Sequence, residues 1–128
     1  MDWILKSQNS WGAFEDEKQP SGACEDIDAI KPLIRFTMQT GYRKTDVDLC
    51  IKRALVWVLA NLNDDGGFVF MLGTPHEYGC HPATSSKLGE SNLFATWFRT
   101  LCLAYMVKYL GIPNQFDIGH FPGYEIGL

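Results

Sequence analysis

Apolar side chains recur at helical spacing in several stretches of this chain. One stretch ends at Gly41, and its apolar residues three and four positions apart fall on one face, which predicts a helix. That face consists of Ile27, Ile30, Leu33, Ile34 and Met38. Pro32 is tolerated in the first turn of a helix, so the acidic residues before it are expected at or just before the helix N-terminus. These acidic residues are Glu25, Asp26 and Asp28.

Two further helices are predicted downstream. The first runs from Thr45 to about residue 61, with Thr45 and Asp48 placed as a capping box. The second runs over about 92–110, is apolar around nearly its whole circumference, and ends at Gly111. The segment between them, from 63 to 90, has no helical period. Because long loops without secondary structure usually serve a site or move, this loop is the first place to look for function.

The amino-terminal pattern repeats after fifty-four positions. Each copy reads as the end of an apolar helix, a polar residue, a glycine turn and an aromatic. The matching pairs are Trp3 and Trp57, Leu5 and Leu59, Asn9 and Asn63, Gly12 and Gly66, and Phe14 and Phe68. Glycine permits a backbone shape that a side chain would obstruct, and the aromatic buries a large apolar area. The repeat therefore predicts an all-α fold of stacked helical hairpins.

Composition narrows the classes of function. The 128 residues, 46% hydrophobic, suffice for the core of one domain over 1–128. A net charge of −4 with scattered basic residues argues against nucleic acid as a partner. No apolar run is long enough for a transmembrane helix. The four cysteines show no close pairing, which favours reduced thiols in a cytoplasmic protein.

Residues 2 to 8 have the pattern of the last turns of a helix without a lead-in. This suggests a sector or C-terminal fragment of a longer protein.

The order of these features resembles the repeats of the terpenoid cyclase and protein prenyltransferase superfamily. The similarity covers most of residues 1–110, and Gln8, Gly12 and Phe14 match the Gln-x-x-x-Gly-x-aromatic turn of squalene-hopene cyclase-like proteins. In the second copy Leu62 stands in place of the glutamine. The resemblance implies an α/α toroid, here an incomplete ring because there are too few hairpins to close it. Uncovered flanks of such a sector predict a homo-oligomer, or docking to a missing part of a longer chain.

The resemblance also implies a candidate acid. Asp26 and Asp28 occupy the first and third positions of the Asp-x-Asp-Asp segment of squalene-hopene and class II diterpene cyclases, whose third-position aspartate protonates an alkene or epoxide. Ala29 replaces the fourth aspartate. Asp28 is then the catalytic candidate and Asp26 its modulator, which requires a carboxyl that is kept protonated and shielded from water. The alternative is that both only complement the N-terminus of a helix.

Metal sites have partial matches only. Asp48-Leu49-Cys50 has the Asp-x-Cys spacing of the prenyltransferase zinc site, yet Cys50 falls on the apolar stripe and fits a buried structural cysteine. His76, Glu77, Cys80 and His81 form a denser cluster in the long loop, which lacks an evident fourth ligand. Leu72 occupies the position where a calcium loop requires a glutamate. We therefore predict neither a metal nor a cofactor.

Aromatic residues of the last helix are candidates to line an apolar cavity, because ring faces stabilise isoprenoid carbocations. They are Phe94, Trp97, Phe98 and Tyr105. Two functions stay open. The first is a cyclase-like or prenyltransferase-like protein that binds an isoprenoid or lipid, with turnover the weaker part of the prediction. The second is a non-catalytic helical-repeat module for protein interaction, or a remnant of a larger enzyme.

Overall fold

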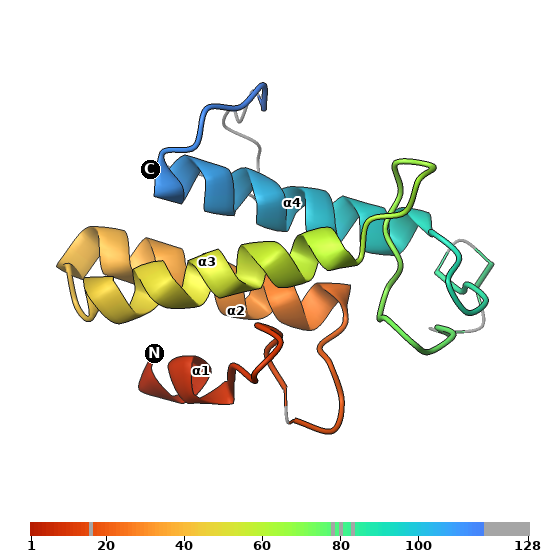
Figure 1. The fold of residues 1–128 in the computed structure, drawn as a ribbon, viewed down its shortest axis with the longest axis horizontal. Helices are drawn as coiled ribbons and strands as arrows, with labels where there is room; N and C mark the ends of the chain where they lie inside the picture. The colour runs from red at the N-terminus through yellow and green to blue at the C-terminus, as the bar shows by residue number, and fades with distance from the viewer. Residues whose placement is uncertain (16, 78, 80, 83, 117–128) are drawn as a thin grey trace.

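The computed structural model describes residues 1–116 except for 16, 78, 80 and 83, and this part of the chain is all-α (Figure 1). Its helices are α1 (Asp2–Ser7), α2 (Ala23–Thr40), α3 (Lys44–Ala60) and α4 (Leu93–Leu110). In the described ranges, β-structure is limited to isolated bridges. The predicted all-α class is therefore confirmed. None of the helices in the described residues has the length and apolarity needed to cross a membrane.

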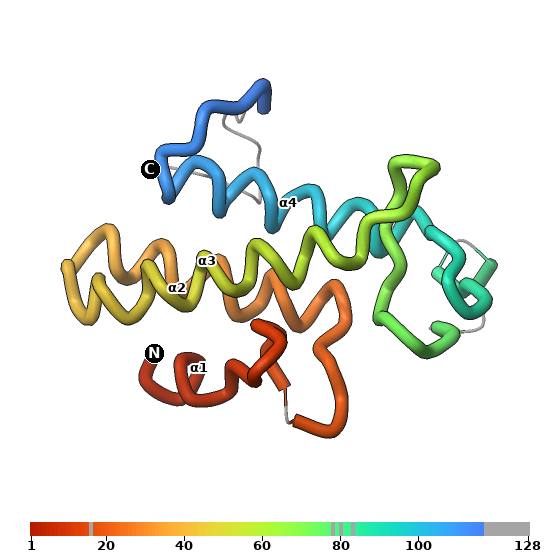
Figure 2. Tube along the Cα trace, viewed as in Figure 1, coloured from red at the N-terminus to blue at the C-terminus, as the bar shows by residue number. Residues whose placement is uncertain are grey.

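Successive helices run in opposite directions, and each glycine corner links two of them into a unit that we call a hairpin, α1–α2 and α3–α4. The long connection from α3 to α4 lies at the right of the view, the one from α1 to α2 lies below the helices near the centre, and the tight α2–α3 turn lies at the left (Figures 1 and 2). Between the hairpins, α2 packs against α4 and α1 against α3, while α3 also contacts both α2 and α4. The first helices of the two hairpins, α1 and α3, therefore lie beside each other, and so do the second helices, α2 and α4.

The two glycine corners have the same backbone structure, as the repeat predicts. Isolated antiparallel bridges join Gln8 to Phe14 and Leu62 to Phe68. Gly12 and Gly66 both have left-handed backbones, with φ of 93° and 82°. Each corner also has the same backbone hydrogen bond: the Asn9 amide donates to the Ala13 carbonyl, and the Asn63 amide donates to the Gly67 carbonyl, each at 2.9 Å. The repeat is thus a structural repeat.

The first corner is anchored on α3 by a close backbone approach. Gln8 Nε2 donates to the Gly12 carbonyl at 3.0 Å and to the Cys50 carbonyl at 2.9 Å. A Cβ on Gly12 would lie 2.4 Å from the Arg53 carbonyl oxygen, so only glycine allows this packing. Gly66 has open space at the same point. The glutamine of the first corner, which the second lacks, therefore fastens one hairpin to the next.

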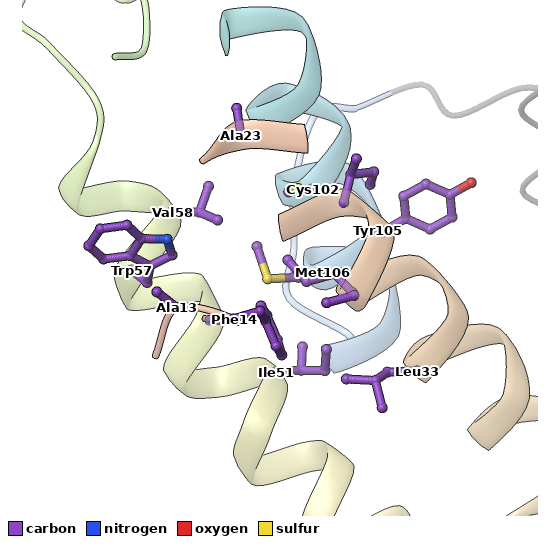
Figure 3. Close-up of a cluster of buried hydrophobic side chains, with 14 of the residues drawn as sticks. Ala13, Phe14, Ala23, Leu33, Ile51, Trp57, Val58, Cys102, Tyr105 and Met106 are labelled. Carbon is purple, nitrogen blue, oxygen red and sulfur yellow. The ribbon is translucent and has the colours of Figure 1, made fainter. Parts of the chain in front are cut away.

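Phe14 and Phe68 both bury their rings in one hydrophobic core. Figure 3 shows Phe14 in the same cluster as Ile51 of α3 and Met106 of α4. The backbone amide of each phenylalanine also donates to a side-chain hydroxyl. Phe14 donates to the Ser21 hydroxyl and Phe68 to the Thr96 hydroxyl, each at 2.9 Å.

The predicted start of α2 and the predicted cap of α3 are wrong. α2 begins at Ala23 and continues through Pro32, so Glu25 and Asp26 lie inside its first turn and Asp28 lies beyond that turn. α3 begins at Lys44, after Arg43 in a left-handed conformation, and no side chain caps it. The predicted capping box is absent because Thr45 lies inside the helix; the Asp48 carboxylate instead accepts hydrogen bonds from Lys44 at 2.6 Å and from the Tyr109 hydroxyl at 2.6 Å.

The remaining predicted ends are confirmed. α4 is capped by Asn92, whose side chain accepts a hydrogen bond from the Ala95 amide at 2.7 Å. Gly41 and Gly111 end α2 and α4 with φ of 69° and 66°. No helix forms in the described part of 63–90, where an isolated bridge joins His76 to Ser86.

Candidate functional site

A buried ion pair joins the two hairpins. Asp26 lies in the first turn of α2 and Arg99 in the second turn of α4, and both side chains are fully buried. Arg99 Nη1 donates to Asp26 Oδ2 at 2.6 Å. Since a lone buried charge is costly, each residue compensates the other.

Neutral groups complete the coordination of Asp26. Trp57 of α3 donates from Nε1 to Asp26 Oδ2 at 3.0 Å, and the Ser21 hydroxyl donates to the other carboxylate oxygen. The same Ser21 hydroxyl accepts from the amide of Phe14, the aromatic of the first corner. The carboxylate therefore connects α2, α3, α4 and the first corner through hydrogen bonds.

Arg99 uses its other nitrogens on the segment that follows the second corner. Nε donates to the Val69 carbonyl at 3.2 Å and Nη2 to the Phe70 carbonyl at 2.8 Å. The guanidinium carbon lies 5.7 Å from the centre of the Trp57 ring. The hydrogen bonds of the ion pair thus connect the first corner with the segment that follows the second corner.

Burial shifts the protonation of this pair. It raises the pKa of the Asp26 carboxyl to about 6, although Arg99, Ser21 and Trp57 each lower it. Burial also lowers the pKa of Arg99, and the Asp26 charge opposes this effect. At neutral pH the pair is ionised, and its donors are arranged to hold a carboxylate. The Asp26–Arg99 network therefore has a structural role, because it holds α2, α3 and α4 together.

The predicted acid and its modulator differ sharply in environment. Asp26 is the fully buried one, whereas Asp28 is exposed on α2. Shielding from water, which an alkene-protonating acid requires, therefore belongs to the residue assigned as modulator. Asp26 is in turn held by three side-chain donors. The catalytic assignment of Asp28 stays a prediction.

An apolar groove lies beside this network, at the corner end of α3. Its volume is about 510 Å³. Its described lining consists of Trp11, Pro20, Val56, Trp57, Ala60, Leu72 and Gly73. Trp57 forms one wall while its indole nitrogen bonds Asp26 on the inner side. The described lining contains no titratable side chain, so the groove is suited to bind an apolar molecule rather than to move a proton.

The aromatic residues predicted as ligand contacts divide between two places. Phe94, Trp97 and Phe98 lie together on α4, with Phe98 4.8 Å from Phe94 and 4.7 Å from Trp97 between ring centres. Tyr105 is instead fully buried in the core. None of the four lines the apolar groove. The sequence interpretation missed the groove residues Trp11 and Val56. The packing of the first corner against α3 brings these two side chains to one groove, and local sequence does not reveal that packing.

Two residues of the loop histidine cluster, His76 and Glu77, line a second cavity of about 520 Å³. Its described lining consists of Pro75, His76, Glu77, Pro82, Ser85, Ser86, Lys87 and Glu90. The His76 ring stacks on Phe70 at 3.5 Å between ring centres. Among the described residues, no three His, Cys, Asp or Glu side chains are placed to hold a metal ion. Cys80 of the predicted cluster lies outside the described residues.

Cys50 is buried, as its place on the apolar stripe predicted. Burial raises the pKa of its thiol to about 12, which disfavours the thiolate that zinc binds. Asp48 of the same tripeptide is taken up by Lys44 and Tyr109. Asp48 and Cys50 therefore have separate structural roles.

Arg99 is the important residue that the sequence interpretation passed over. It is the single charged residue in the first fifteen positions of an otherwise apolar or neutral helix. That isolation is a usable signal, because a charge on a helix buried on most sides requires a buried partner of opposite sign. The identity of the partner, seventy-three positions away, was not readable from spacing.

No family model matches this chain, and neither the curated proteins nor the solved structures contain a significant match.

Proposed function

We propose that this chain is a helical-hairpin module of the α/α-toroid type that binds an apolar chain, an isoprenoid or a lipid tail, without turning it over. The observation that carries the proposal is the apolar groove of about 510 Å³ between the first corner and α3. Its volume falls in the range of small-molecule sites, roughly 300–1,000 Å³. Two indole rings, Trp11 and Trp57, supply flat apolar walls.

The lack of turnover follows from where the acids lie. Neither Asp28 nor Asp26 is among the described residues that line the groove. Asp26 is separated from it by Trp57 and is held by Arg99. Protonation of an alkene needs a carboxyl in contact with the substrate. The groove accordingly binds an apolar ligand and leaves it chemically unchanged.

The proposed setting is cytoplasmic, with reduced thiols. The cysteines of the described ranges, Cys24, Cys50 and Cys102, are free. Burial raises the pKa of Cys24 to about 11, so this thiol is unreactive at neutral pH.

Calorimetric titration with farnesol and with dodecanoate tests the binding. We expect saturable binding of at least one probe, with affinity weakened tenfold or more by Val56→Asp, which places a charge in the groove. Trp11→Ala removes the more exposed of the two indole rings and should weaken binding in the same direction. Trp97→Ala is the matched control, because Trp97 is 48% exposed and Trp11 50% exposed, yet only Trp11 lines the groove.

Two results would count against the proposal. One is the absence of heat with both probes for the unaltered protein. The other is unchanged affinity in both groove variants, which would place the ligand elsewhere.

A further inference from the structure

Trp57 is the residue through which the buried ion pair reaches the apolar groove. It is 5% exposed and lines the groove, so only a small part of its ring borders the ligand space. Its Nε1 donates to Asp26 Oδ2 at 3.0 Å, and the Arg99 guanidinium carbon lies 5.7 Å from its ring centre. Both members of the ion pair therefore contact the side chain that forms one wall of the groove.

The hydrogen bond to Asp26 fixes the orientation of the Trp57 ring. An indole carries a single polar hydrogen, which needs an acceptor when the ring is buried. Packing in the core also restricts the ring, but the hydrogen bond is the contact that distinguishes its nitrogen edge from its carbon edge. A ring turned over in place would direct Nε1 away from the carboxylate. The shape of this groove wall therefore depends on Asp26.

The strength of this hydrogen bond depends on the charge of Asp26. A hydrogen bond to an ionised acceptor is shorter than one between neutral groups and about twice as strong. Oδ2 is also the oxygen that accepts from Arg99, so protonation of the carboxyl weakens both contacts at once. A protonated Asp26 therefore holds the Trp57 ring less firmly than an ionised one.

We propose that Asp26 is a positioning residue for the ligand groove: its carboxylate holds the Trp57 ring in place as a wall, and its protonation releases the ring. This inference rests on the proposed function, because it specifies how the same groove is regulated. An apolar ligand then binds preferentially to the form in which Asp26 is ionised, so acidification weakens binding. Because linkage is reciprocal, a bound ligand lowers the pKa of Asp26.

Charged and polar groups face Asp26 from each element packed against it. Arg99 and Cys102 do so from α4, Trp57 from α3, and Ser21 from the segment before α2. Burial raises the pKa of Cys102 well above its usual value, so this thiol stays neutral in the range where Asp26 titrates. Arg99 stays cationic because a guanidinium is not deprotonated in proteins.

The remaining titratable groups nearby are Glu25 and Asp28 on α2 and His76 in the loop. The Glu25 charge acts on both Arg99 and His76. His76 stacks on Phe70, whose carbonyl accepts from Arg99. Burial lowers the pKa of His76, so its titration falls close to that of Asp26. A pH dependence of binding must therefore be assigned to Asp26 by substitution, with His76→Gln as the matched control.

Calorimetric titration with farnesol at about pH 7.5 and about pH 5 tests the regulation, because farnesol has no group that titrates between them. Since the pKa of Asp26 is about 6, about one tenth of the protein is ionised at Asp26 at the lower pH, and the dissociation constant should rise by about three- to tenfold. Trp57→Phe keeps an aromatic wall without the indole nitrogen and should bind with no pH dependence. Asp26→Asn should bind weakly at both pH values, and His76→Gln should keep the pH dependence.

The indole resonance of Trp57 gives a readout that needs no ligand. In isotope-labelled protein, its N–H signal is assigned by its absence in Trp57→Phe. This signal should shift with a midpoint near pH 6, the pKa of Asp26, in both the unaltered chain and His76→Gln. Saturating farnesol should move the midpoint to lower pH. A role of Asp26 in stability alone would leave the midpoint unchanged by ligand.

The two measurements separate this inference from the proposed function. Equal farnesol affinity at both pH values, or a pH dependence that survives in Trp57→Phe, would overturn the regulation while the groove keeps its ligand. An indole signal that does not move between about pH 5 and about pH 7.5 would overturn the positioning of Trp57 by Asp26. Absence of farnesol binding with an intact indole titration would instead overturn the proposed ligand and leave that positioning confirmed.

Discussion

Arg99 binds Asp26 across seventy-three positions of sequence, with Nη1 and Oδ2 2.6 Å apart and both side chains fully buried. We predict that Arg99→Met lowers the free energy of unfolding by about 3–5 kcal/mol, because it leaves the Asp26 charge buried without its cation. Urea denaturation measures the change. The double variant Asp26→Leu/Arg99→Met should lose less than the sum of the two single variants, and strict additivity would show that the pair is not coupled.

The exposed ion pair between Asp2 and Arg43 provides the comparison for that prediction. Its N–O distance is 3.1 Å, but the Arg43 and Asp2 side chains are 36% and 52% exposed. Water solvates these charges when the pair is broken, so Arg43→Met should destabilise far less than Arg99→Met. Equal losses would mean that burial does not set the strength of the Asp26–Arg99 interaction.

The pH dependence of stability should carry the signature of Asp26. Burial raises its pKa in the folded protein to about 6, above the value of about 3.9 for an aspartate in an unfolded chain. The folded state therefore holds this proton more tightly. Protonation of Asp26 therefore contributes its full stabilisation below about pH 4. This contribution declines as the pH rises to about 6, and the free energy of unfolding no longer depends on Asp26 titration above that pH. The unfolding free energy of the unaltered chain minus that of Asp26→Asn isolates this term. A difference that rises with pH over the same interval would show that Arg99 outweighs burial.

The two corner glycines should respond differently to the same substitution. Both have left-handed backbones, so alanine at either position costs about 1–2 kcal/mol. Gly12→Ala should cost more than Gly66→Ala, because its new methyl group meets the Arg53 carbonyl whereas nothing lies near the methyl at Gly66. Thermal unfolding of both variants measures the difference. Equal losses would show that the first corner can move away from α3 without cost.

The glutamine of the first corner allows a second comparison within the repeat. Gln8→Ala removes two hydrogen bonds, to Gly12 and to Cys50 of α3, and should destabilise by about 1–3 kcal/mol. Leu62→Ala, at the corresponding position of the second corner, alters a side chain that is 46% exposed and should cost less. A larger effect at Leu62 would contradict the anchoring role of Gln8.

Asp28→Asn tests the remaining catalytic prediction. Asp28 is exposed and lies beyond the first turn of α2, so the substitution should change the free energy of unfolding by no more than about 0.5 kcal/mol. Incubation of the unaltered protein with squalene or a prenyl diphosphate, followed by mass spectrometry, should yield no product. A product that disappears in Asp28→Asn would restore Asp28 as an acid and remove the non-catalytic part of our proposal.

Local patterns in the sequence predicted the helices and the repeat well. The apolar period, Asn92 and the glycines at 41 and 111 located α4 and the C-terminal end of α2, because these signals act within one or two helical turns. The starts of α2 and α3 were predicted less well. Pro32 does not mark the first turn of α2, because the helix continues past it, and Asp48 is drawn away from a capping role by Tyr109 of a distant helix. At Asp48 a tertiary contact thus takes the place of the predicted local role, whereas Pro32 is exposed and its place inside α2 has no such explanation.

The amino-acid sequence by itself determined that this protein is built of helices joined by two equivalent corners, since helical period and glycine turns are short-range properties of the chain. Only the tertiary structure decided which aspartate is buried, that Arg99 is its partner, and which corner residues enclose the groove. Asp26 and Asp28 stand two positions apart on one helix, and residues at this spacing point to nearly opposite sides of the helix. The packing of the second hairpin against the first therefore shields one of them from water and leaves the other exposed.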